Sequence, residues 1–425
     1  MLTKLRHKLS SEDNKRLLSN FLSLTFLQGA NYILPLISFP YLVRVIGMEK
    51  YGLLAFANVT ITYFFIITDY GFNLSATRQI SIFRNDSKKV SEIFSAVMSI
   101  KIILMLISML LLGLLIFAFD KYRCDYEIYF FSFGMVVGQV LFPIWFFQGM
   151  ERMKYITYLN VLAKLIFTIS IFVFVIEEKD FYKVPLLNAI GFILSGLLSL
   201  VLVKKQFKIK FQIQPNSIIK EQLKDGWYIF TSRIYVSLYS TTNLFLLGVM
   251  TNNTIVGYYT VADRIISITC RLFSIINQTV YPHMAKLKET NYDQFLLFFK
   301  KTTQVFLLSS FFLFSILFIF KKWIILLISG DLNTNVVIIY SILVFTIFTN
   351  PFGPFYTQTL LIMKKNEIFN KIVKNTFLFN ISISPIFIHY LNGIGLAIVT
   401  ILSQLFVMSL CFINIKKGIK NEKIS

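Results

Sequence analysis

The sequence predicts an all-α polytopic membrane protein with about twelve transmembrane helices. Of its 425 residues, 56% are hydrophobic and only 15% are charged. Long apolar runs follow one another along the whole chain, separated by short polar segments. A soluble domain of this length would rarely be so apolar, and an apolar run of about 20 residues is long enough to cross a bilayer as a helix.

The apolar runs define the expected spans in chain order. They lie at approximately 17–46, 52–80, 93–119, 127–149, 156–176, 184–203, 226–250, 255–283, 295–329, 335–362, 368–390 and 393–415. The ninth run is long and is interrupted by Lys321 and Lys322. We expect a tilted helix to end there and an interfacial segment to follow it.

The orientation follows from the positions of the basic residues. The large majority of the 42 lysines and arginines fall in the terminal segments 1–16 and 416–425 and in the loops that share their side of the membrane. Cytoplasmic loops carry this excess, so both termini are predicted to be cytoplasmic. The same distribution accounts for the net charge of +21 without a nucleic-acid partner.

A basic connection at 204–225 divides the predicted spans into two lobes of six helices, 17–203 and 226–415. A short repeat supports this division. Tyr51–Ala57 (YGLLAFA) opens the second span and Val256–Ala262 (VGYYTVA) opens the eighth, with Gly and Ala at matching positions. Because six spans separate the copies, the lobes are expected to be related by a pseudo-two-fold axis along the membrane normal.

The composition indicates no enzyme, metal site or cofactor. The three cysteines and three histidines are scattered, and the chain has no nucleophile elbow, P-loop or HExxH motif. The loops on the side opposite the termini are short, about ten residues or fewer, which leaves no domain for chemistry there.

The eighth span carries the strongest functional signal. Its polar residues recur at steps of three and four, which places them on one face of a helix: Arg264, Ser267, Arg271, Ser274 and Gln278. A charged side chain at the bilayer centre costs roughly 2.5–3.5 kcal/mol on insertion scales, so this face should meet protein or water. A cationic face suggests an anionic substrate. The alternative is a structural ion pair in which Asp263 neutralises Arg264.

Further polar residues within the spans are candidate substrate contacts. They are Gln28 and Asn31 in the first span, Arg233 in the seventh, and Lys101 and Lys164 in the third and fifth. The two lysines either line a cavity or extend toward the cytoplasmic face.

Asp69 and Asp263 are the candidates for ion coupling, because a carboxylate buried in a membrane protein can titrate. Such coupling would use a proton or sodium gradient or the membrane potential. For Asp69 a second interpretation is equally open, in which it is the partner of Lys101 or Lys164. The second span is expected to bend at Gly71.

Three stretches of this sequence resemble Wzx-type O-antigen and polysaccharide flippases. They are Thr68–Arg78 (TDYGFNLSATR), Trp145–Met153 (WFFQGMERM) and Asn252–Tyr259 (NNTIVGYY). The resemblance implies two six-helix bundles in the bacterial inner membrane, belonging to the multidrug and oligosaccharidyl-lipid exporter superfamily. It implies translocation of an undecaprenyl-diphosphate-linked oligosaccharide from the cytoplasmic to the periplasmic leaflet through a cationic cavity. A polysaccharide polymerase and a chain-length regulator are the implied protein partners.

Two rival functions share this fold class. Multidrug exporters of cationic drugs are expected to use acidic or aromatic cavities, whereas this chain has more intramembrane bases than acids. Lipid II flippases are closer in chemistry but usually have fourteen helices. O-antigen polymerases and ligases, which are enzymes, are expected to carry a large periplasmic loop that this sequence lacks. We therefore expect alternating access in which Arg233, Arg264 and Arg271 hold the diphosphate, and the sequence leaves the glycan open.

Overall fold

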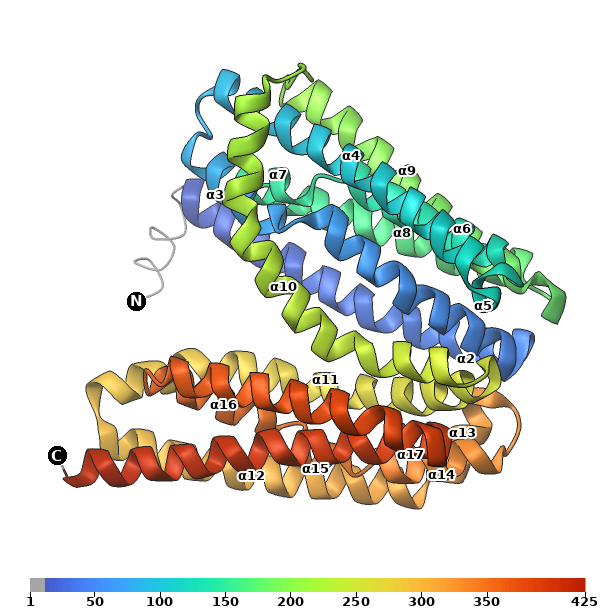
Figure 1. Cartoon of the computed structure of the whole chain (residues 1–425). Coiled ribbons are helices and arrows are strands. Elements are labelled where there is room, and N and C mark those ends of the chain that lie inside the picture. Colours follow the sequence, from blue (N-terminus) through green and yellow to red (C-terminus); the bar gives the residue numbers. More distant parts are fainter. Residues whose placement is uncertain (1–11, 425) are drawn as a thin grey trace. The chain divides into compact units, whose positions relative to one another are not determined.

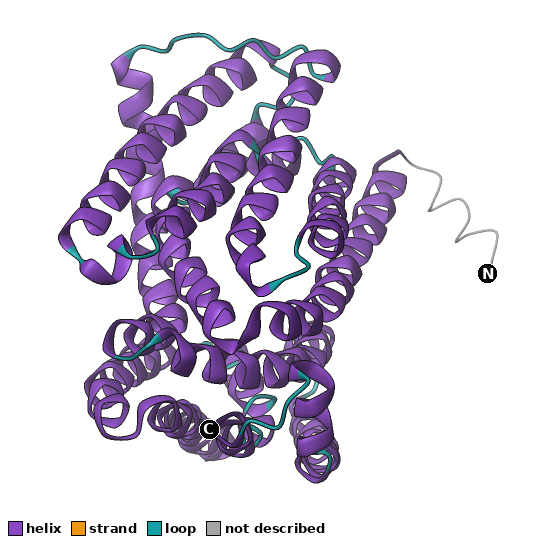
Figure 2. Cartoon of the chain, turned by 90° about the vertical axis from the view of Figure 1, so that its right-hand side faces the viewer, coloured by secondary structure: helices purple, strands orange, loops and turns teal. Residues whose placement is uncertain are grey.

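The computed structural model describes the backbone of residues 12–424. It describes the side chains of the same residues except 12–28, 30–32, 232, 235–240 and 421–424. The described chain is helical almost throughout, with short loops and no strand (Figures 1 and 2).

The helices are α2 (Glu12–Asp69), α3 (Phe72–Ile82), α4 (Ser87–Ala118), α5 (Asp120–Arg123), α6 (Tyr126–Leu141), α7 (Ile144–Gly149), α8 (Met153–Phe174), the 3₁₀ helix η1 (Glu178–Tyr182), α9 (Lys183–Gln206), α10 (Asn216–Met250), α11 (Asn253–Thr290), α12 (Tyr292–Ile319), α13 (Lys321–Ser329), α14 (Thr334–Leu343), α15 (Thr346–Thr349), α16 (Phe352–Ile362) and α17 (Asn366–Ile424).

Eight helical regions of the described chain are long and apolar enough to cross a membrane. Asn366–Lys420 contains two of the spans predicted from the sequence, and Ile33–Ile82 contains the second predicted span and the end of the first. The predicted seventh and eighth spans are α10 and α11, which are helical but fall outside the eight. The chain is therefore an all-α polytopic membrane protein, as predicted.

Glycines mark two interruptions in the N-terminal helices. Gly47 has a φ of 74° inside α2 and separates the first predicted span from the second. Gly71 has a φ of 79° between α2 and α3, which confirms the bend predicted there. Both values lie in the region that glycine adopts without steric cost. The helix end expected near Lys321 is also confirmed, because α12 ends at Ile319 and α13 begins at Lys321.

The described chain divides by its internal contacts into two compact units. Unit 1 holds Ala57–Thr241 together with the described residues up to Ile46. Unit 2 holds Gly47–Phe56 together with the described residues from Thr242 onward. Helix α10 therefore contributes to both units. The expected lobes were defined by counting spans and not by contacts. Their bounds, 17–203 and 226–415 joined by 204–225, remain a prediction.

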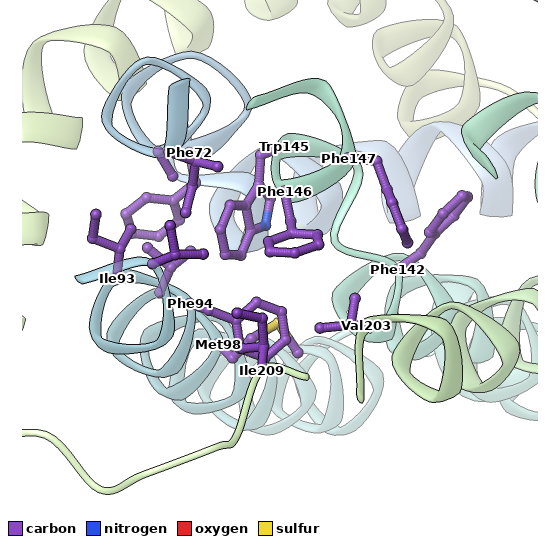
Figure 3. Packing of buried hydrophobic residues seen from close by; sticks show 14 of the residues in the cluster. Phe72, Ile93, Phe94, Met98, Phe142, Trp145, Phe146, Phe147, Val203 and Ile209 are labelled. Atoms are coloured by element: carbon purple, nitrogen blue, oxygen red, sulfur yellow. The ribbon is translucent and has the colours of Figure 1, made fainter. Parts of the chain in front are cut away.

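A buried aromatic cluster forms the core of unit 1 where α3, α4 and α7 meet (Figure 3). Phe72 of α3, Phe94 of α4, and Trp145 and Phe146 of α7 lie in this cluster. The ring of Phe94 meets those of Trp145 and Phe146 at centroid distances of 5.7 and 5.6 Å. Buried aromatic side chains of this size contribute a large part of the packing energy of a core.

Polar contacts also join the chain around α3 to the chain around α7. The Thr77 hydroxyl donates to the Trp145 carbonyl oxygen at 3.2 Å. Arg84 donates to both carboxylate oxygens of Glu151, each at 2.7 Å. A Cβ on Gly149 would lie 2.9 Å from the Thr77 carbonyl oxygen, so α3 and α7 pack backbone to backbone. Two of the stretches that resemble the flippase family therefore hold unit 1 together.

Two glycines of the predicted repeat face each other inside unit 2. A Cβ on Gly52 would collide with the carbonyl oxygen of Asn253, and a Cβ on Gly257 would collide with that of Met48. At the spacing that relates the two copies of the repeat, Met48 corresponds to Asn253 and Gly52 to Gly257. Gly52 therefore contacts the counterpart of Met48, and Gly257 contacts Met48 itself. This reciprocal pattern is the one that a local two-fold axis produces. Close approach of small residues is a common way to pack membrane helices.

A second pair of matching turns lies farther along the chain, one in each unit. Helix α7 is followed by Glu151 with a φ of 54°, and α16 is followed by Lys364 with a φ of 58°. In both turns the next amide, of Arg152 or Lys365, donates to the carbonyl five residues back, at 2.8 and 3.0 Å. The same turn geometry at corresponding places supports an internal repeat.

We predict that Gly257→Ala lowers the stability of the protein, because the new Cβ would be forced into the Met48 carbonyl. Overpacking of this kind typically costs about 1–3 kcal/mol. The measurement is thermal unfolding of the full chain in detergent. Gly353→Ala is the matched control, since a Cβ at Gly353 meets nothing within 4 Å. Equal melting temperatures for the two variants would contradict the prediction.

Candidate functional site

A buried acid lies at the end of α2. Asp69 is the last residue of that helix and is 3% exposed. Arg233 of α10 forms an ion pair with it through one guanidinium nitrogen and the carboxylate oxygen Oδ2. The other oxygen, Oδ1, is buried and has no hydrogen-bond partner among the described residues. Sequence analysis selected both residues but did not pair them.

The ion pair forms because α10 passes very close to the α2–α3 break. A Cβ on Gly71 would meet the Ile229 side chain at 2.7 Å, and a Cβ on Gly226 would meet the Tyr70 carbonyl at 2.9 Å. The rings of Tyr70 and Phe230 stack with their centroids 4.7 Å apart. Asp69 lies directly before this contact, and Arg233 lies one turn beyond Ile229 on α10, so the close approach brings their side chains within reach of each other.

Lys101 of α4 completes this cluster. Its side chain is 2% exposed, and the Asp69 carboxylate interacts electrostatically with its ammonium group. A charge buried at this depth is tolerated only where an opposite charge compensates it. Asp69 therefore has an ion-pair partner, Arg233, and a second basic side chain, Lys101, that interacts with it. Lys164, the other lysine considered, is half-buried on α8.

The predicted polar stripe of the eighth span lies on one continuous helix, α11. Its N-terminal members, Arg264 and Ser267, are half-buried, and the members from Arg271 onward are exposed. The Ser267 hydroxyl donates to the Arg264 carbonyl at 3.1 Å, and the Gln278 amide donates to the Ser274 hydroxyl at 3.4 Å. The described members of the stripe are Arg264, Ser267, Arg271, Ser274 and Gln278.

Arg264 has two polar neighbours inside unit 2. It interacts electrostatically with the Asp263 carboxylate and with the Tyr51 phenol. Tyr51 reaches unit 2 because Gly47–Phe56 belongs to that unit. The interaction with Asp263 agrees with the interpretation in which Asp263 neutralises Arg264. It is also compatible with the interpretation in which Arg264 binds an anionic substrate.

The predicted residues thus fall into two groups. Asp69, Lys101 and Arg233 form a cluster in unit 1, whereas Asp263 and the stripe from Arg264 onward belong to α11 in unit 2. Gln28 and Asn31 belong to α2, and their side chains lie outside the described residues.

Sequence analysis missed a neutral polar cluster in unit 2. The Asn380 amide donates to the Ser403 hydroxyl at 2.9 Å, and the Ser384 hydroxyl contacts the Asn243 oxygen at 3.4 Å. Asn380, Ser384 and Ser403 are all buried. The signal was present in the sequence, because Asn380 and Ser384 are spaced by four within an apolar span and so share a helix face.

We predict that Asn380→Leu destabilises the protein by about 1–3 kcal/mol, the usual cost of a buried polar group left unpaired. Leucine keeps the γ-branched shape of asparagine but has no amide, so the Ser403 hydroxyl loses its donor. Thermal unfolding in detergent is the measurement. Ser382→Ala is the control, because Ser382 is exposed and bonds only to its own helical turn. An unchanged melting temperature in Asn380→Leu would show that the cluster does not contribute to stability.

Comparison with known proteins identifies the family. A family model described as "Polysaccharide biosynthesis protein" matches residues 17–288. The chain belongs to this polysaccharide biosynthesis family. It is 31% identical over 283 residues to a protein of Escherichia coli (strain K12) described as "Putative O-antigen transporter", covering 67% of this chain and 68% of the relative. A protein of Shigella dysenteriae with the same description is 30% identical over 277 residues, covering 64% and 69%.

Solved structures share the fold across almost the whole chain. Lipid II flippase MurJ in its inward closed conformation has a TM-score of 0.72 at 14% identity, covering 94% of this chain and 87% of that one. An inward-facing multidrug resistance MATE transporter of the MOP superfamily has a TM-score of 0.65 at 14% identity, covering 92% and 99%. The predicted family resemblance and fold class are both confirmed.

Proposed function

We propose that this protein is a transporter that moves undecaprenyl-diphosphate-linked O-antigen, or a related polysaccharide repeat unit, from the cytoplasmic to the periplasmic leaflet of the bacterial inner membrane. The observation that carries the proposal is the cationic face of α11, where Arg264 and Arg271 lie among hydroxyl and amide side chains. A lone arginine facing lipid would be strongly unfavourable, so two on one face call for an anionic partner.

Arginine suits a diphosphate for two reasons. Its planar guanidinium can donate to two oxygens at once, and it stays charged at any physiological pH. Ser267, Ser274 and Gln278 continue the same face, and their hydroxyl and amide groups can bind sugar hydroxyls. Gln28, Asn31, Lys101 and Lys164 are proposed as further contacts. The diphosphate is held by Arg233, Arg264 and Arg271 in this proposal.

The relatives and the charge distribution together favour this substrate over others. The E. coli and S. dysenteriae relatives are described as O-antigen transporters. The fold alone does not choose, because both a lipid II flippase and a multidrug transporter share it. A multidrug exporter is the second candidate, and the excess of intramembrane bases over acids in this chain argues against a cationic cargo. The names of the relatives are those of transporters, which agrees with a protein that is not an enzyme.

The proposed mechanism is alternating access of two lobes around a cationic cavity, with the lipid tail remaining in the bilayer. Asp69 or Asp263 resets the cycle by taking up a proton or sodium ion. The membrane potential adds roughly 2.3 kcal/mol per elementary charge per 100 mV. A polysaccharide polymerase and a chain-length regulator are the proposed partners.

We predict that the double variant Arg264→Gln/Arg271→Gln loses transport by more than about tenfold, since each arginine would contribute charge-assisted hydrogen bonds to the diphosphate. The measurement is complementation of a host that lacks its own O-antigen flippase, scored by polysaccharide on surface lipopolysaccharide at matched expression.

Lys300→Gln/Lys301→Gln is the matched control for this experiment. It removes two positive charges from two exposed positions of α12 in the same unit. Normal transport by the double arginine variant would show that the stripe does not bind substrate. If the wild type does not complement, the multidrug function is tested next by measuring the drug resistance of the same cells.

The orientation can be tested with the native cysteines. Cys124 is exposed after α5, whereas Cys270 and Cys411 are buried. If both termini are cytoplasmic, Cys124 lies on the periplasmic side. We predict that a membrane-impermeant maleimide labels the wild type in intact spheroplasts and does not label Cys124→Ser. Labelling that needs permeabilised membranes would reverse the orientation.

A further inference from the structure

The ion pair in unit 1 places a carboxylate on a guanidinium that the proposed function assigns to the substrate. We propose that Asp69 is an internal counter-anion, which occupies Arg233 while no substrate is bound and is displaced by the diphosphate of the substrate. This inference rests on the proposed function and adds to it a competition for one of the binding residues.

The geometry of the pair suits displacement. Arg233 contacts Asp69 through one nitrogen and one oxygen only, although a guanidinium and a carboxylate can form two parallel hydrogen bonds. The Arg233 side chain is 43% exposed, so a second anion can approach it while Asp69 is still bound. Asp69 itself is almost fully buried and cannot follow Arg233 outward.

The chemistry of the two anions favours the substrate. A diphosphate carries more negative charge than a carboxylate and offers several acceptor oxygens to the five N–H donors of arginine. Asp69 offers Arg233 a single hydrogen-bonded oxygen. A bidentate, more highly charged ligand therefore replaces the monodentate internal one, whereas a neutral or weakly charged molecule does not. The ion pair therefore selects for ligands that bind Arg233 more strongly than Asp69 does.

Lys101 lowers the energetic cost of separating Arg233 from Asp69. A buried carboxylate that lost its only cation would be strongly unfavourable. The ammonium of Lys101 is equally buried and interacts with Asp69 from another helix, α4. When Arg233 leaves, Lys101 still compensates the charge of Asp69. The arrangement of one acid between two bases therefore permits an exchange that a simple pair would resist.

Displacement also changes the junction between α2 and α10. Asp69 and Arg233 form a polar link beside the contacts at Gly71 and Gly226. Once the diphosphate takes Arg233, the described polar links that remain at this junction are Gln79 to Asp225 at 2.8 Å, Gln222 to Gln79 at 2.7 Å and the Arg78–Asp225 ion pair at 3.8 Å. Helix α10 continues past Thr241 into unit 2.

A static structural pair makes a different prediction. If the substrate never displaced Asp69, Arg233 would take no part in anion binding by the wild type, and Arg233→Gln alone would leave the wild-type affinity for anions unchanged. Displacement requires that Arg233→Gln weakens anion binding, so the affinity of this single variant, measured in the same titrations, separates the two roles.

The experiment measures binding of inorganic pyrophosphate and of undecaprenyl diphosphate to the purified full-length protein by isothermal titration calorimetry. We expect Asp69→Asn to bind both ligands about tenfold more tightly than the wild type, because Arg233 no longer has to be released from a charged competitor. We expect the double variant Asp69→Asn/Arg233→Gln to lose this gain.

Two control variants accompany the measurement. Asp120→Asn removes one exposed carboxylate far along the chain from the cluster, and its affinity should equal that of the wild type. Asp69→Asn/Lys101→Met keeps the net charge of the cluster and is compared with Lys101→Met, so that any contribution of Lys101 to binding cancels; the gain in affinity should persist in this comparison. If Asp69→Asn does not fold, as judged by thermal unfolding, this comparison takes its place.

The outcomes separate the inference from the proposed function. Equal or weaker binding by a folded Asp69→Asn protein would overturn the counter-anion role, as would a gain that survives Arg233→Gln. Wild-type binding of undecaprenyl diphosphate that is lost in Arg264→Gln/Arg271→Gln, with no change in Asp69→Asn, sustains the proposed function alone. Absence of undecaprenyl diphosphate binding in the wild type and in every variant would overturn both.

Discussion

A carboxylate buried in an apolar helix bundle needs a positive charge beside it, and this constraint organises unit 1. Asp69 has that charge from Arg233 on α10 and from Lys101 on α4. The break after α2 and the glycine contacts around it bring these three helices close enough to meet the requirement. In the proposed exchange, Lys101 keeps Asp69 compensated while Arg233 binds the ligand. Charge compensation and ligand binding would then be two uses of one cluster.

The stretches that carry the family resemblance lie mostly in packing rather than in a binding face. Thr77 and Gly149 join α3 to α7, and the aromatic cluster of unit 1 surrounds that contact. Gly257 packs against the second-span segment around Met48 in unit 2. Of the charged residues in these stretches, Glu151 pairs with Arg84 and Arg78 with Asp225, whereas Asp69 pairs with Arg233, which the proposed function assigns to the substrate. A sequence stretch that resembles a family can therefore report how its helices are held together rather than what it binds.

The fold sets the scaffold, and the charges on it discriminate among functions. A flippase and a multidrug transporter share this architecture with the chain at 14% identity. We infer the function of this chain from the chemistry of its polar helix faces. Helix α11 is less apolar than the other long helices, and Arg264 and Arg271 share one of its faces. That face is the part of the chain proposed to meet an anion.

The sequence by itself determined the helical class, nearly all the spans, the bend at Gly71 and the polar face of α11, because each depends on residues close together in the chain. Tertiary structure alone decided that Arg233 meets Asp69, that Gly52 faces Gly257, and that Asn380 bonds to Ser403. These pairs lie on different helices or on either side of the Asn392 break in α17. Periodicity fixes which residues share a face of one helix, but the partner of that face depends on how the helices rotate and pack.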